Sequence, residues 1–339
     1  MTVTIKDIAR LSGYAVGTVS RVLNNSPDVS DAAREKIMAV VEEHHFRLNN
    51  NAKHLKQQSS SGIAIVVKGT QNMLFATIVE RIQSLVRDSG YASFIYYLDE
   101  DDDELEQALQ VSRERRPFGI LFLGSNLDYF RECFPSITVP CVLVTNSAEE
   151  LQFENLSSVS TDDEEAAARA LGYLMELGHT QIGVLGGKME VSNAACERYA
   201  GVERAFREHQ MPFDRETQYE SARFAMSDGY AAMGRLLDKM PGLTAVFAMS
   251  DVQAVGAIRA LHDRGLRVPE DISVVGFDGI ELGRYVSPKL TTIRQDARRM
   301  ADRGVELLLR QIREGGTAVH ERVPYELVEG ESARGLAPR

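Results

Sequence analysis

Hydrophobic residues in the first 45 positions recur at helical spacing in three short segments. The apolar residues of each segment lie three or four positions apart, which places them on one face of an α-helix. These positions are Ile5, Ile8 and Ala9, then Val19, Val22 and Leu23, and then Ala33, Ile37, Val40 and Val41. The turn that contains Gly13 joins the first two segments, and this arrangement is typical of a helix-turn-helix. A plain three-helix bundle has the same pattern and stays open as an alternative.

From residue 63 the pattern changes to short apolar runs that alternate with longer amphipathic segments. The runs span residues 63–67, 93–97, 119–123, 141–145, 182–185, 245–248 and 272–277. Such alternation predicts parallel sheets with helices on both faces, and so many strands favour two lobes over one large sheet. Residues 290–293, followed by a helical segment over 298–313, predict that the chain returns to the first lobe.

These patterns divide the chain into four parts of an α/β protein. We expect a three-helix head over residues 1–46, a linker over 47–61, a first lobe over 62–161 plus 294–322, and a second lobe over 162–293 plus 323–339. The linker is polar and leads into a Gln- and Ser-rich stretch with weak helix potential. No apolar run is long enough to span a membrane, and the first residues lack a secretory signal, so a cytoplasmic location without membrane contact is expected.

Composition and charge change this picture little. The chain has 339 residues, of which 44% are hydrophobic and 26% charged, which suffices for large cores. The net charge of −11 opposes DNA binding, but residues 1–58 hold eight Lys or Arg and six Asp or Glu, so this part is mildly basic. The charge thus permits nucleic-acid binding without establishing it. The three cysteines form no CxxC pair and are expected to be buried free thiols.

Specific motifs decide between the helix-turn-helix and a plain bundle. The head contains Thr4-Ile5-Lys6-Asp7-Ile8-Ala9, then Gly13, then Thr18-Val19-Ser20-Arg21-Val22-Leu23-Asn24. It resembles the head of the LacI/GalR (lactose-repressor) family of transcriptional regulators. Motifs such as Glu197-Arg198-Tyr199-Ala200-Gly201 extend the resemblance over nearly the whole chain. The resemblance implies a sequence-specific repressor with a periplasmic-binding-protein-like body of two lobes, which a small effector controls allosterically.

The resemblance assigns DNA contacts to the second helical segment and to the linker, which matches the family's hinge helix. The DNA-binding residues implied are Thr4, Val16, Gly17, Thr18, Ser20, Arg21, Asn24, Ala52, Leu55 and Lys56. In the family, residues at the position of Arg21 read bases in the major groove, and the leucine at the position of Leu55 wedges into the minor groove. A solvated surface charge and an ordinary packing leucine are the alternatives. Ala15 and Gly17 depart from the family pattern and predict fewer direct base contacts or more weight on the hinge. Leu48 stands where family members commonly have proline, which predicts a looser hinge geometry.

The effector is expected between the lobes, because ligands of open α/β sheets bind beyond the carboxyl ends of the strands. The resemblance implies Phe75, Arg198, Phe224 and Asp278 as effector-binding residues, and position just past strand ends adds Asn146 and Ser250 as second-rank candidates. A carboxylate and a guanidinium facing aromatic rings suit a sugar or a nucleoside. Core packing for Phe75, an interlobe salt bridge for Arg198 and a turn or cap role for Asp278 remain alternatives.

The same motifs bear on oligomeric state, on metals and cofactors, and on whether the chain is an enzyme. The resemblance implies a homodimer on a near-palindromic operator in double-stranded DNA, and neither a cofactor nor a metal is expected. The acidic run over residues 99–104 lacks the glycine and spacing of a calcium loop, so a solvated helix start is expected. The chain has no GxGxxG after its first strand and no GxxxxGK[ST], HExxH or GxSxG motif, which argues against an enzyme. A soluble sugar-binding protein with the same body is the other alternative.

Overall fold

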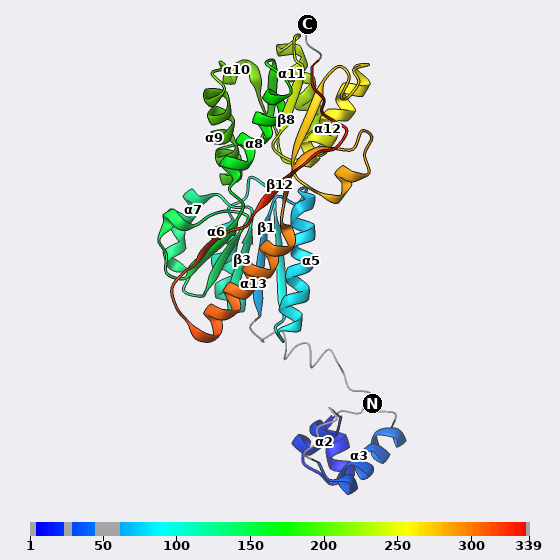
Figure 1. Cartoon of the computed structure of the whole chain (residues 1–339). Helices are drawn as coiled ribbons and strands as arrows, with labels where there is room; N and C mark the ends of the chain where they lie inside the picture. Colours follow the sequence, from blue (N-terminus) through cyan, green and yellow to red (C-terminus); the bar gives the residue numbers. More distant parts are fainter. Residues whose placement is uncertain (1–4, 24–28, 45–61, 337–339) are drawn as a thin grey trace. The chain divides into compact units, whose positions relative to one another are not determined.

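The computed structural model describes residues 5–23, 29–44 and 62–336 (Figure 1). Contacts divide the chain into two units, residues 1–60 and 61–339, and each has its own hydrophobic core. Several positions of interest lie outside the described residues, namely Thr4, Asn24, Leu48, Ala52, Leu55 and Lys56.

The first unit contains the three predicted helices, α1 (Ile5–Ser12), α2 (Val16–Leu23) and α3 (Asp31–Glu43). Ile8, Val19 and Ile37, one from each helix, are fully buried and form the centre of a small core. Gly13 ends α1 with a φ of +74°, a left-handed conformation that glycine adopts without a steric penalty. The apolar spacing of the sequence therefore produces three helices packed on one shared core.

The second unit holds two six-stranded sheets, one in each lobe. The first sheet is parallel and its order is β11-β5-β4-β3-β1-β2. Its strands are β1 (Ile63–Lys68), β2 (Ser93–Leu98), β3 (Gly119–Leu123), β4 (Cys141–Val144), β5 (Leu156–Ser160) and β11 (His320–Arg322). The strands β3 and β4 are apolar throughout, and β1 is apolar up to its last residue, Lys68, because helices cover both faces of the sheet.

The second sheet has the order β12-β10-β9-β8-β6-β7 and is parallel except for β12, which runs antiparallel to β10. Its strands are β6 (Ile182–Gly186), β7 (Tyr219–Ser221), β8 (Ala245–Ala248), β9 (Ser273–Asp278), β10 (Thr291–Gln295) and β12 (Tyr325–Val328). The predicted lobe boundary at residue 294 falls inside β10, because Gln295 still pairs with Tyr325 of β12. The second sheet therefore continues to residue 295.

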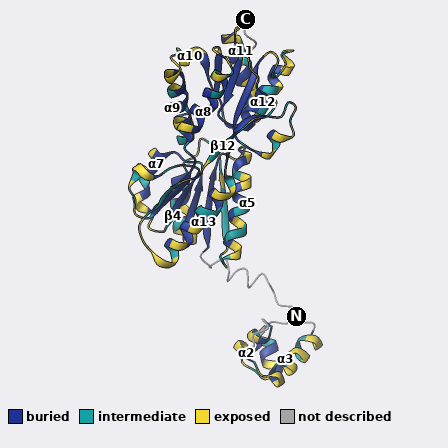
Figure 2. Ribbon diagram, in the orientation of Figure 1, coloured by how far each residue is buried: buried dark blue, intermediate teal, exposed yellow. Residues whose placement is uncertain are grey.

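Helices cover both faces of each sheet, and their outward faces are exposed (Figure 2). The first lobe carries α5 (Met73–Asp88), α6 (Glu104–Arg115), α7 (Leu127–Cys133) and α13 (Ala297–Glu314). The second lobe carries α8 (Asp163–Glu176), α9 (Asn193–Glu208), α10 (Arg215–Gln218), α11 (Met226–Lys239) and α12 (Asp251–Asp263). Short 3-10 helices span Phe134–Ser136, Glu149–Leu151 and Glu281–Arg284. The helix after β10 thus returns to the first lobe, where α13 packs against α5.

The described structure also bears on two other expectations, the absence of a membrane-spanning helix and the burial of the cysteines. Among the described residues, no helix is both long enough and apolar enough to cross a membrane. The cysteines are free, but only Cys141 is buried, whereas Cys133 is half-buried and Cys196 is exposed on α9. The expectation of three buried thiols is therefore wrong for Cys196, whose position on the outward side of an amphipathic helix leaves it in solvent.

Candidate functional site

The first candidate surface is the outward side of α2. Val19 and Val22 anchor this helix in the core, and Val16, Gly17 and Arg21 are exposed on the other side. Thr18 and Ser20 are half-buried beside them. Among the described residues, a Cβ placed on Gly17 would meet nothing within 4 Å, so packing does not demand a glycine there. Val16, Gly17 and Arg21 therefore form an open surface that can approach a DNA groove.

The start of α2 explains how the helix forms without a capping side chain at Ala15. The carbonyl oxygen of Ala15 accepts hydrogen bonds from the amides of Thr18 (2.9 Å) and Val19 (3.1 Å). The guanidinium of Arg21 donates through Nε to the carbonyl oxygen of Gly17 at 3.3 Å. The side chain of Arg21 thus folds back along the face that Gly17 leaves open.

The second candidate site is a cleft between the two lobes, with a cavity volume of about 40 Å³. It lies where β1, β3 and β4 end, as expected for parallel sheets. The first lobe contributes Lys68, Gly69, Asn72, Leu74, Phe75, Glu100, Gly124, Ser125, Thr145 and Asn146. The second lobe contributes Val191, Ser192, Ala194, Arg198 and Phe224. Four predicted effector residues, Phe75, Asn146, Arg198 and Phe224, therefore line one cleft.

Phe75 and Phe224 face the cleft from opposite lobes. Phe75, on the first turn of α5, is half-buried, and a Cβ on Gly124 would come within 3.0 Å of its ring. Gly124 also has a φ of +69°, so glycine is required there on both grounds. The arrangement leaves room for the ring of Phe75 at the cleft wall.

Arg198 is held by the second lobe alone. Its Nε donates to Oδ1 of Asp163 at 2.7 Å, its Nη1 donates to the carbonyl oxygen of Met249, and its Nη2 lies 3.5 Å from Oδ1 of Asp278. The guanidinium carbon also lies 3.8 Å from the centre of the Phe277 ring. The alternative of an interlobe salt bridge is therefore wrong, since these partners all belong to the second lobe.

Asp278 is buried at the end of β9, next to Arg198. Its Oδ1 accepts a hydrogen bond from Nε2 of Gln295 at 2.8 Å, and its Oδ2 has no hydrogen-bond partner among the described residues. Burial raises the pKa of this carboxyl to about 6, although Arg198, Gln295 and, from the first lobe, Asn72 favour the ionised form. The residue also has a φ of +112°, a strained conformation for a non-glycine residue. Strain and an unpaired acceptor are features that functional positions share, although Asp278 is not among the described residues that line the cleft.

The two lobes contact each other through the acidic run over residues 99–104. Oε1 of Glu100 accepts a hydrogen bond from the amide of Phe224 at 2.9 Å. Asp99 and Asp101 both pair with Arg223, and Asp101 also pairs with Lys188 at 3.0 Å. These ion pairs hold the lobes together over the cleft.

The expectation of a solvated helix start over residues 99–104 is wrong in part. Asp103 does cap α6, because its carboxylate accepts from the amides of Leu105 and Glu106. However, Glu104 is fully buried and Glu100 lines the cleft, where burial raises the pKa of each carboxyl. Among the described residues, no cluster of His, Cys, Asp and Glu could hold a metal ion.

Ser250 has a different role from the one expected. It is fully buried and caps α12, where its Oγ accepts from the amide of Gln253 at 3.3 Å. It is not among the described residues that line the cleft. Serine is a favoured N-cap, so the sequence alone does not separate this role from ligand binding.

Sequence reasoning also missed several residues of the cleft. Lys68, Asn72, Ser125, Thr145 and Ser192 line it but belong to no motif used above. Only their position at or just after the ends of predicted strands, or at the N-caps of α5 and α9 for Asn72 and Ser192, could have indicated them.

Comparison with protein families identifies both units. The description "Bacterial regulatory proteins, lacI family" matches residues 4–49, and "Periplasmic binding protein-like domain" matches residues 171–333. Among curated proteins, the HTH-type transcriptional regulator MalR of Clostridium butyricum is 36% identical and covers 97% of this chain and 98% of its own length. The HTH-type transcriptional repressor PurR of Vibrio atlanticus is 32% identical and covers 96% of this chain and 95% of its own length.

Solved structures agree with these matches. A transcriptional regulator CelR–cellobiose complex superposes with a TM-score of 0.71 at 28% identity, covering 98% of this chain and all of its own. The lac repressor dimer bound to operator and the anti-inducer ONPF superposes with a TM-score of 0.76 at 25% identity, covering 99% of this chain and all of its own.

Proposed function

Since this chain belongs to the lacI family of bacterial regulatory proteins, we propose that it is a repressor whose affinity for operator DNA changes when a small effector binds between its lobes. Relatives that match nearly the whole chain are named transcriptional regulators or repressors. The alternatives of an enzyme and of a free sugar-binding protein are therefore set aside. A repressor of this kind acts in the cytoplasm, where the DNA lies.

The observation that carries the proposal is the open face of α2. A recognition helix must bury one side in its own domain and present the other to the major groove. Val19 and Val22 supply the buried side, and Arg21 lies on the exposed side with Gly17. A guanidinium at this place can bind a guanine edge or a phosphate. Residues 47–61 would add a hinge contact in the minor groove.

The cleft supports an effector of sugar or nucleoside type. Aromatic rings from both lobes, Phe75 and Phe224, are suited to the faces of a ring compound, while Asn146 and Arg198 in the cleft wall offer polar contacts. The CelR structure named above contains cellobiose, a compound of this class. A ligand that touches both lobes changes the equilibrium between their arrangements only if it binds one arrangement more tightly. We propose that this shift lowers operator affinity, which is induction.

We further propose that two chains pair through their bodies and bind a near-palindromic operator together, because two symmetric half-sites match two heads. The second lobe leaves large apolar side chains in solvent that a partner chain can cover, including Tyr285 (74% exposed), Tyr230 (42%) and Met226 (37%). The lac repressor named above is a dimer on its operator. Sedimentation velocity should give about twice the mass of the 37.6 kDa chain.

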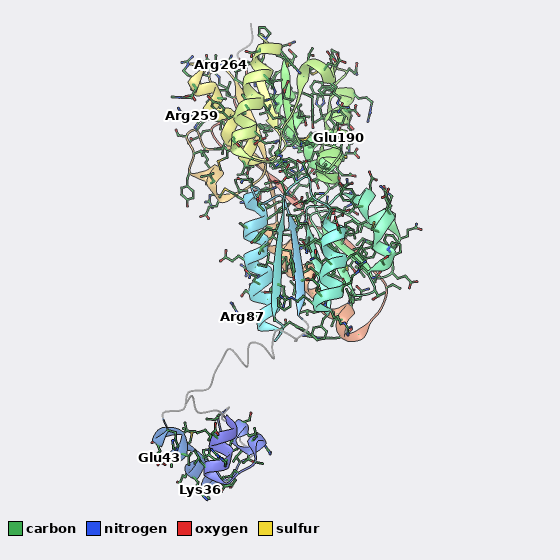
Figure 3. The ribbon with its side chains drawn as sticks, turned by 180° about the vertical axis from the view of Figure 1, so that it is seen from behind. Lys36, Glu43, Arg87, Glu190, Arg259 and Arg264 are labelled. Atoms are coloured by element: carbon green, nitrogen blue, oxygen red, sulfur yellow. The ribbon has the colours of Figure 1, made fainter. Side chains whose placement is uncertain are left out.

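The test uses DNA selected from a random library by the full-length protein, followed by anisotropy titrations. Arg21→Ala should weaken binding to the selected sequence by roughly 1–3 kcal/mol and reduce its preference over random DNA. Lys36→Ala is the matched control, since it removes the same charge from the exposed side of α3 (Figure 3). Equal losses for both variants would show that α2 does not read sequence.

A further inference from the structure

We propose that the effector is an uncharged polyhydroxyl compound and that the cleft rejects the phosphorylated or carboxylated form of the same compound. This inference rests on the proposed function, in which the cleft between the lobes holds the effector. It concerns the charge of the ligand and the rejection of its anionic forms, which the sequence motifs do not assign.

Lys68 is one of the two cationic side chains that line the cleft in the described part of the chain, and it is already paired with a carboxylate. Its Nζ donates to Oε2 of Glu104 at 2.8 Å, and both side chains are almost completely buried, with 4% and 0% exposed. The other carboxylate oxygen of Glu104 accepts from the amide of Asn126 at 2.6 Å. Nζ also lies 4.8 Å from the centre of the Tyr129 ring. Lys68 is therefore committed to the first lobe and offers little to an anionic ligand.

Arg198 is the second cationic side chain of the cleft, and two carboxylates share it. Asp163 and Asp278 both contact the guanidinium, and the carbonyl oxygen of Met249 takes a further N–H. A phosphate would have to compete with these buried partners for the same N–H groups. Displacing them would leave two buried carboxylates without their cation, which is a costly arrangement.

The carboxylates around the cleft outnumber these cations. Glu104, Asp163 and Asp278 face Lys68 and Arg198, and Glu100 adds a fourth carboxylate in the cleft wall. Glu100 is hydrogen-bonded only by a neutral amide, that of Phe224, in the described structure. Arg223 and Lys188, the cations beside the cleft, already form ion pairs with Asp99 and Asp101. An anion here would meet like charges in a low dielectric.

The unpaired polar atoms of the site match hydroxyl groups instead. Among the described residues, Nδ2 of Asn146 and Oγ of Ser125 in the cleft wall, and Oδ2 of Asp278 beside Arg198, are buried without a hydrogen-bond partner. These atoms are a donor, a hydroxyl that can donate or accept, and an acceptor. A hydroxyl both donates and accepts, so several hydroxyls on one ring can satisfy all three, whereas a phosphate only accepts near neutral pH. Phe75 and Phe224 supply the apolar walls for the ring.

The test compares neutral compounds with their anionic counterparts in calorimetric titrations of the full-length protein. The panel pairs glucose with glucose 6-phosphate and glucuronate, cellobiose and maltose with their 6-phosphates, ribose with ribose 5-phosphate, and adenosine with its monophosphate. The neutral member that binds should have a Kd at least about 100-fold below that of its anionic partner. An anionic member that binds more tightly than its neutral parent would overturn the inference.

A charge variant locates the effect in the cleft. Glu100→Gln removes one carboxylate but keeps an oxygen that can accept a hydrogen bond from the amide of Phe224. The ratio of the anionic to the neutral Kd should therefore fall by roughly 10-fold. Glu106→Gln, on the exposed side of α6, removes the same charge away from the cleft and should leave the ratio unchanged. Equal ratios in the wild type and Glu100→Gln would contradict the assignment.

Operator binding measured on the same samples separates this inference from the proposed function. If an anionic compound binds preferentially and changes operator affinity, the regulator stands and the charge inference fails. If a neutral compound binds selectively but leaves operator affinity unchanged, the charge inference stands and the proposed regulation fails.

Discussion

Replacing Asp278 by asparagine removes a buried carboxyl whose ionisation opposes folding. The pKa of this group is about 6 in the folded chain, against 3.8 as its ordinary value, and burial is the main cause. Between these two pH values the folded chain holds the proton while the unfolded chain has released it. The folded state binds more protons there, so stability falls as pH rises through this window. A difference of about two pKa units corresponds to about 3 kcal/mol.

The asparagine of the variant carries no ionisable proton, so this loss should disappear. The free energy of unfolding of Asp278→Asn, relative to the wild type, should therefore increase by roughly 2–3 kcal/mol between pH 4 and pH 7. Its absolute value at one pH also depends on the contacts with Arg198 and Gln295. Its change with pH includes Asp251, whose pKa the Asp278 charge raises, so the substitution acts on both carboxyls in the same direction. Urea titrations at pH 4, 5, 6 and 7 measure this stability difference. Circular dichroism follows the unfolding, because the chain has no tryptophan for fluorescence.

Asp271→Asn is the control for this prediction. Arg267 holds the pKa of the exposed Asp271 carboxyl at about 2, so its titration lies below the tested range. Its stability difference from the wild type should stay level from pH 4 to pH 7. If the Asp278→Asn difference is equally level, the reasoning about the buried carboxyl is refuted.

Three further changes test the packing of the body. Gly201→Ala should lower the free energy of unfolding by several kcal/mol, because the added Cβ would collide with the backbone of α8; Gly242→Ala, where the described structure leaves open space, should have little effect. Arg223→Gln should loosen the lobes, seen as faster amide hydrogen exchange around the cleft, whereas Arg264→Gln at the outer end of the second lobe should not (Figure 3). Arg198→Leu should cost about 3–5 kcal/mol in urea unfolding, since it leaves two buried carboxylates without their cation; a loss below about 1 kcal/mol would contradict that pairing.

The strands that the sequence predicted are those with continuous apolar runs. The run in β5 (Leu156–Ser160) contains three serines, so its polar residues concealed a fully buried strand. The structure explains the serines by their partners: Oγ of Ser158 lies 2.8 Å from Nδ1 of His320 and accepts from the amide of Ala148. The strands β7 and β11 have three residues each and give too little pattern to recognise.

The candidate cleft was predictable where a residue follows a strand or belongs to a motif, and unpredictable where partners are distant in sequence. The pairing of Lys68 with Glu104 joins residues 36 positions apart, and neither is marked by a local motif. The acidic run looked like a solvated helix start because the sequence does not show that the second lobe packs against Glu100. Likewise, Ser250 has the sequence context of both a helix cap and a ligand contact, and only the structure distinguishes them.

The most direct test of the regulator is a single titration of the full-length protein on a labelled operator, with and without the neutral compound found by calorimetry. The account predicts sequence-specific binding that weakens steeply as salt rises, and release of the operator when the compound is added. By reciprocity, the operator should weaken binding of the compound by the same factor. Binding without preference for any selected sequence, or operator affinity that the bound compound does not change, would contradict it.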